Sequence, residues 1–129
     1  ETGRPQCVIF VDGIAKINFA GLGREIRYHD QFAPRGTNVN FVEVLDNNFI
    51  RIRTYERGVE DETLACGTGS TASAVISGVK MNRTGNIKIS VLTQGNEVLK
   101  VYFKRIDKVV SDTWLEGKAS IVYKGEYNV

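Results

Sequence analysis

The chain has 129 residues, of which 42% are hydrophobic and 25% are charged, and its formal net charge is +2. These values are typical of one soluble globular domain. They exclude a strongly basic nucleic-acid-binding protein, and no apolar run reaches the roughly 18 residues that predict a membrane span.

The cysteines and the histidine bound the chemistry further. Cys7 and Cys66 are the only cysteines, no Cys-x-x-Cys pair occurs, and His29 is the only histidine. We therefore expect no metal site. Because no signal-peptide pattern opens the chain, we expect free thiols in a reducing compartment, which is typical of a cytoplasmic protein. The absence of an initiator Met predicts an excised or processed fragment.

Apolar periodicity predicts seven strands and two helices. In chain order they are a strand over 7–11, a helix over 19–30, strands over 41–45 and 49–55, a helix over 70–80, and strands over 87–92, 98–105, 109–116 and 119–127. This mixture predicts an α+β domain with no internal repeat.

The two helices differ in their surfaces. In the first, Asn18 has the place of an N-cap, and we expect one buried face made of Phe19, Leu22, Ile26 and His29. His29 then has a structural role. The second helix is apolar or small all round and so predicts a buried helix, with a mixed or antiparallel sheet wrapped around it.

The second helix is preceded by Cys66-Gly67-Thr68-Gly69. A helix N-terminus has unpaired N–H groups and a partial positive charge, so it stabilises an anion. A thiol there has a lowered pKa, and the N–H groups from Gly67 to Ser70 can hold a carboxylate or a phosphate. These four residues alone leave a second interpretation open, namely a small buried cysteine beside a tight turn.

A longer stretch is more specific. The segment TYERGVEDETLACGTGSTAS resembles the motif around the second catalytic cysteine of the diaminopimelate epimerase family. The resemblance extends back through GTNVNFVEVLDNNFIRIRTYERG and forward to the C-terminus. It implies one half of the family's fold, in which a barrel-like sheet surrounds a central helix.

The resemblance also implies an activity. The family converts LL-diaminopimelate to meso-diaminopimelate, in lysine and peptidoglycan-precursor biosynthesis, without pyridoxal phosphate or another cofactor. Two cysteines, one in each half, act on opposite faces of the substrate's α-carbon as general base and acid. Cys66 matches the second of them. Gly67, Thr68 and Gly69 match the residues that hold the α-carboxylate of this small amino-acid substrate.

Three further positions match the family's site. Glu56 and Arg57 match a Glu–Arg pair, in which Glu56 positions the reacting group and Arg57 binds a carboxylate. Asn38 matches an asparagine that binds the distal end of the substrate. Without the resemblance, Arg57 reads as a surface ion-pair residue and Asn38 as a turn residue.

The chain departs from the family in two respects. Family members are about twice as long, so residues 1–129 resemble only the C-terminal half, without its first strands. The usual Gly-x-Pro-His reads Gly3-Arg4-Pro5-Gln6 here, which replaces a titratable histidine. Cys7 lies on the wrong segment to be the second base. We therefore expect this chain to be inactive alone and to need the other catalytic half or self-association.

Two alternatives stay open at this point. Proline or hydroxyproline racemases also use two cysteines, but their second cysteine follows an Asp–Arg pair and a Ser-Pro, where this chain has Glu56-Arg57 and Leu64-Ala65. The other alternative is a non-catalytic module that binds a carboxylate or associates with itself.

Overall fold

The computed structural model describes residues 6–29, 36–63 and 67–117, together with the backbone of 121–128. Its elements in chain order are β1 (Gln6–Phe10), the 3-10 helix η1 (Ile14–Lys16), α1 (Phe19–Arg27), β2 (Asn38–Asp46), β3 (Phe49–Glu56), β4 (Asp61–Thr63), α2 (Gly67–Lys80), β5 (Gly85–Leu92), β6 (Val98–Ile106), β7 (Val109–Glu116) and β8 (Ile121–Asn128).

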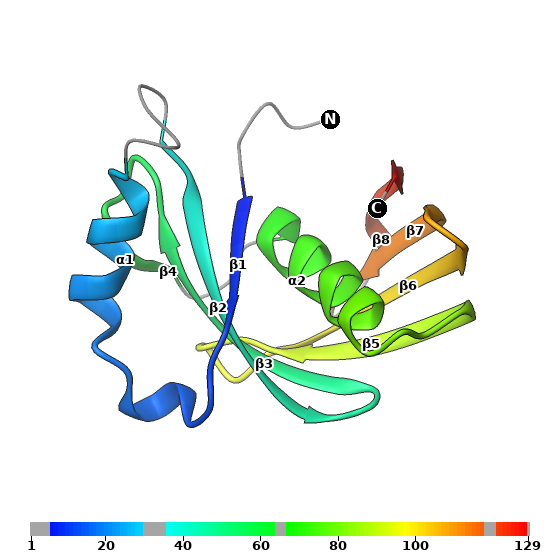
Figure 1. Ribbon diagram of the computed structural model, residues 1–129, viewed down its shortest axis with the longest axis horizontal. Coiled ribbons are helices and arrows are strands. Elements are labelled where there is room, and N and C mark those ends of the chain that lie inside the picture. The colour runs from blue at the N-terminus through cyan, green and yellow to red at the C-terminus, as the bar shows by residue number, and fades with distance from the viewer. Residues whose placement is uncertain (1–5, 30–35, 64–66, 118–120, 129) are drawn as a thin grey trace.

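All described strands belong to one mixed sheet. Its order is β1-β2-β3-β5-β6-β7-β8, and β4 pairs with β3 beside this path. The pairs β1/β2 and β3/β5 are parallel, and the other pairs are antiparallel. Figure 1 shows the sheet curling around α2. The predicted α+β fold with a sheet wrapped around a helix is confirmed.

The helix α2 occupies the concave side of this sheet. It contacts β1, β2, β3, β5, β6 and β7. Ala74 is fully buried in a cluster to which β2 and β3 contribute from one side and β5, β6 and β7 from the other. Ile76, with 38% exposure, faces outward. A helix with small residues on most sides can approach several strands at once, and this explains the absence of a polar face. The prediction of a central buried helix is confirmed.

A second, smaller core lies on the other face of β2 and β3. There, η1 and α1 cover the sheet with a cluster of Ile14, Phe19, Val39, Phe41 and Tyr55. The rings of Phe19 and Phe41 meet edge to face at 5.5 Å between centroids, which is a favourable aromatic arrangement. The odd-numbered side chains of β2 therefore face α1, and the even-numbered ones face α2.

The predicted buried face of α1 is wrong in two positions. Leu22 and His29 are exposed, and the face is instead Phe19, Gly23 and Ile26. The reason is a close approach at Gly23, where a Cβ atom would lie 2.7 Å from the ring of Tyr55. This contact sets the rotation of the helix and turns Leu22 to solvent. The helix also ends at Arg27, three residues before the predicted end.

Two boundaries near the motif also differ from the prediction. The expected loop over 56–64 contains the short strand β4, which pairs with β3 through Thr54↔Thr63 and Glu56↔Asp61. A run of acidic residues has low strand propensity, but the ion pair from Arg53 to Glu62, 2.8 Å long, supports the pairing. The helix α2 begins at Gly67 rather than at Ser70, so the Gly-Thr-Gly segment forms its first turn.

Candidate active site

Of the predicted site residues, Asn38 and the Glu56-Arg57 pair lie side by side at one end of the sheet. Gln6 at the start of β1 pairs with Asn38 at the start of β2, and Val39 pairs with Tyr55, so Asn38 lies beside Glu56 at the end of β3. The starts of β1 and β2 lie at the same side of the sheet as the first turn of α2 (Figure 1). The fold thus gathers segments that are distant in the sequence.

Asn38 holds the turn that follows β3. The residue is only 2% exposed, and its Oδ1 accepts a hydrogen bond of 2.6 Å from the backbone N–H of Arg57. This bond leaves the amide NH₂ of Asn38 as the group that can serve as a donor to a ligand. A role in binding the distal end of the substrate stays a prediction.

Two hydrogen bonds of Glu60 close the turn that follows Glu56. The N–H of Glu60 donates to the carbonyl of Glu56 over 2.8 Å, and the Glu60 carboxylate accepts from the N–H of Gly58 over 3.1 Å. Arg57 therefore stands on a short turn that is hydrogen-bonded from several sides.

The first turn of α2 offers the N–H groups expected of an anion site. Gly67 is exposed and Thr68 is half-buried, whereas Gly69 and Ser70 are buried. Thr71 closes the turn, because its hydroxyl donates to the carbonyl of Gly67 over 2.9 Å. Cys66 and the two residues before it lie outside the described residues, so the structure supports the helix start but not the position of the thiol.

A buried polar relay under this end of the sheet was missed from the sequence. The hydroxyl of Thr54 donates to Oδ1 of Asn40 over 2.9 Å, and Nδ2 of Asn40 donates to Oε1 of Gln6 over 2.9 Å and to the carbonyl of Cys7 over 3.2 Å. The carbonyl can only accept, so it fixes which way the Asn40 amide faces. The signal in the sequence was the presence of Asn40 in β2 and Thr54 in β3, each at an inward position of a strand whose other inward residues are mostly apolar.

Several buried polar atoms at this end have no hydrogen-bond partner among the described residues. They are Nε2 of Gln6, Oε1 of Glu60 and the hydroxyl oxygens of Thr63, Ser70 and Ser73. Because Asn40 holds Oε1 of Gln6, the Gln6 amide presents its NH₂ elsewhere. Buried polar atoms without a partner are costly and are often completed by a bound group.

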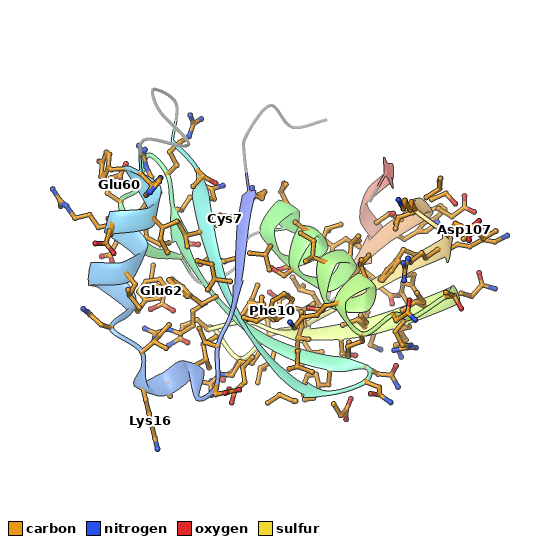
Figure 2. All side chains as sticks on the ribbon, in the orientation of Figure 1. Cys7, Phe10, Lys16, Glu60, Glu62 and Asp107 are labelled. Atoms are coloured by element: carbon orange, nitrogen blue, oxygen red, sulfur yellow. The ribbon has the colours of Figure 1, made fainter. Side chains whose placement is uncertain are left out.

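Cys7 is a free thiol on β1 (Figure 2). Burial raises its pKa, so less of it is thiolate at neutral pH. No cluster of three His, Cys, Asp or Glu side chains suitable for a metal occurs in the described part of the chain. No helix within that part is long and apolar enough to cross a membrane.

Comparison with known proteins places this arrangement in a family. The profile of the diaminopimelate epimerase family matches residues 1–122. The chain is 45% identical to a diaminopimelate epimerase of Aquifex aeolicus, over 97% of this chain and 43% of that protein. It is 47% identical to one of Hydrogenobaculum, over 97% of this chain and 44% of that protein.

A third relative is a diaminopimelate epimerase of Methanocella arvoryzae, 44% identical over 100% of this chain and 43% of that protein. The chain thus spans less than half the length of each of these three relatives. The matches support the diaminopimelate epimerase resemblance over the racemase alternative. The chain belongs to the diaminopimelate epimerase family.

Proposed function

We propose that this chain is the second-cysteine half of a diaminopimelate epimerase and holds one base and most of the carboxylate site. The observation that carries the proposal is the hydrogen bond that joins Asn38 to the Glu56-Arg57 turn, at the side of the sheet where α2 begins (Figure 1). Cys66 directly precedes that turn in the sequence.

Each residue has a role in this proposal. Cys66 removes the α-proton as a thiolate, or returns a proton as a thiol, on one face of the α-carbon. The N–H groups of Gly67, Thr68 and Gly69 hold the α-carboxylate at the positive end of α2 and stabilise the charge that develops as the proton leaves.

The residues on the strands complete the half-site. Arg57 binds a carboxylate through its planar guanidinium, Asn38 donates to the distal end of the substrate, and Glu56 positions the reacting group. A cysteine contributed by the missing half, or by a second copy, acts on the opposite face. No step in this scheme requires a cofactor.

The half-site can be tested by ligand binding alone. Titration of the chain with LL-diaminopimelate should shift the amide NMR signals of Gly67 to Ser70 and Arg57 first. Because half a site leaves its ligand wet, we expect a dissociation constant on the order of millimolar.

A pair of variants makes this test specific. Arg57→Ala should weaken binding, since it removes the cation at the site. Arg83→Ala is the matched control, because Arg83 follows the opposite end of α2 and donates to the carbonyl of Asn47. Shifts that cluster elsewhere, or equal affinities for the two variants, would contradict the proposed half-site.

A further inference from the structure

An ion pair joins α1 to the turn that carries Arg57. Nε and Nη2 of Arg27 donate to Oε2 of Glu60 over 3.1 and 2.8 Å, and the two side chains are 12% and 30% exposed. The guanidinium of Arg27 also stacks on the ring of Tyr28 at 4.4 Å. Figure 2 shows Glu60 beside the C-terminal end of α1. Partial burial and the stacked guanidinium make this pair more rigid than an ordinary surface pair.

Glu60 has a backbone conformation that is unfavourable for a residue with a side chain. Its φ is +61°, in the left-handed region that a residue with a side chain adopts at a cost of about 1–2 kcal/mol. A glycine would avoid that cost. The carboxylate, however, reaches both Arg27 and the N–H of Gly58, and neither contact is possible for glycine. The strained position is therefore occupied by a side chain that ties the turn to α1.

Arg27 touches the approach to β2 as well. A Cβ atom at Gly36 would collide with the guanidinium of Arg27, so this side chain lies directly against the segment two residues before Asn38. Asn38 in turn accepts the N–H of Arg57. One guanidinium thus packs against both segments that carry strand-borne site residues.

The carboxylate of Glu60 stays ionised at neutral pH. Burial by itself raises its pKa, but hydrogen bonds from Gly58, Arg27 and Tyr28, with the charge of Arg27, outweigh burial and lower the pKa below its ordinary value. A group with a lowered folded-state pKa stabilises the fold above its unfolded pKa, about 4.3 for Glu. That contribution is lost as the pH falls through the folded-state value.

We propose that the Arg27–Glu60 pair is a positioning device that holds Asn38 and Arg57 in the geometry that binds a carboxylate ligand. The pair acts through the 57–60 turn and not through contact with the ligand. The inference rests on the proposed function for the identity of the ligand. The effect of the ion pair on the turn can be measured without a ligand.

Glu60→Gly is the decisive variant. Glycine accepts the left-handed backbone, so relief of strain offsets part of the lost ion pair and the melting temperature should change little. The N–H of Arg57 should nevertheless exchange with deuterium about tenfold faster, because Asn38 no longer faces a fixed turn. Affinity for LL-diaminopimelate, followed by NMR, should fall about tenfold, an effect of the size known for residues that act through others.

Two further variants separate positioning from general stability. Glu60→Gln keeps an acceptor for Gly58 and Arg27 and should restore part of the affinity. Glu62→Gln is the matched control, because Glu62 forms an equally short pair with Arg53, at 17% and 19% exposure, on strands β3 and β4 outside the turn. This control should change neither the exchange of the Arg57 amide nor the affinity.

The outcomes distinguish the two proposals. Unchanged exchange of the Arg57 amide in Glu60→Gly overturns the positioning inference whatever the ligand does, as does an equal effect in Glu62→Gln. If Arg57→Ala weakens binding and Glu60→Gly does not, the inference fails alone. If the amide exchanges faster but neither the parent chain nor Arg57→Ala responds to the ligand, the proposed function fails and the role of the pair in holding the turn stands.

Discussion

We expect the two cysteines of this chain to differ in reactivity. Cys7 is on a strand, where burial raises its pKa. Cys66 directly precedes the first residue of α2 in the sequence, and we propose that the positive end of this helix makes its thiol the more reactive one. The proposed chemistry needs this difference, because a base must be partly ionised near neutral pH.

Alkylation measures that difference directly. In the folded chain near pH 7.5, iodoacetamide should modify Cys66 faster than Cys7, and the two rates should converge in denaturant, where both thiols are exposed. Peptide mass spectrometry at several times gives both rates from one sample. Equal rates in the folded state would argue against an activated Cys66.

At the scale of elements, α2 is the part of the fold on which most packing depends. Ala74→Asp would bury a carboxylate without a partner, and we expect it to destabilise the chain by about 3–5 kcal/mol. Ile76→Asp is the control on the same helix, because Ile76 is 38% exposed and its carboxylate would reach water. Its cost should be about 1 kcal/mol in denaturant unfolding. A cost within about 0.5 kcal/mol for Ala74→Asp, the usual range at a surface, would mean that α2 is peripheral.

Apolar periodicity predicted the elements well where one face of an element is buried against one partner. The alternation in β3 is an example, since Ile50, Ile52 and Thr54 are all buried as expected. The rotation of α1 was not predictable, because the contact between Gly23 and Tyr55 depends on tertiary packing. The same holds for β4, whose backbone pairing with β3 is supported by a cross-strand ion pair that propensity does not reveal.

For the candidate site, the prediction depended on the family motif. The contacts around the motif residues were not predicted. The motif named Asn38 and Arg57, but not the hydrogen bond between them. The Thr54–Asn40–Gln6 relay and the Arg27–Glu60 pair join residues 14 to 34 positions apart in the sequence, and such pairs leave no periodic pattern.

At the scale of the whole molecule, half a site should bind but not turn over. Epimerisation requires a proton donor on the face opposite the base, and we propose that a second half supplies it. With LL-diaminopimelate in deuterated water, the chain should therefore show no sustained epimerisation. NMR loss of the α-proton signal and chiral chromatography check both steps. Sustained turnover that rises with the square of protein concentration would point to two copies with facing Cys66 residues.

The way β3 changes partners has a consequence for the motions of the domain. Only Phe49 to Arg51 pair with β5, and from Thr54 onward β4 occupies the same edge of β3. The three register pairs, together with the packing of α2, are the main links between the part made of β1–β4 and the part made of β5–β8, and these pairs lie at the end of β3 away from Glu56. We expect each part to open locally as its own cooperative unit while both stay packed against α2. We expect these openings to separate the two parts most at the end that holds Asn38 and Glu56, and least at the end where β3 pairs with β5.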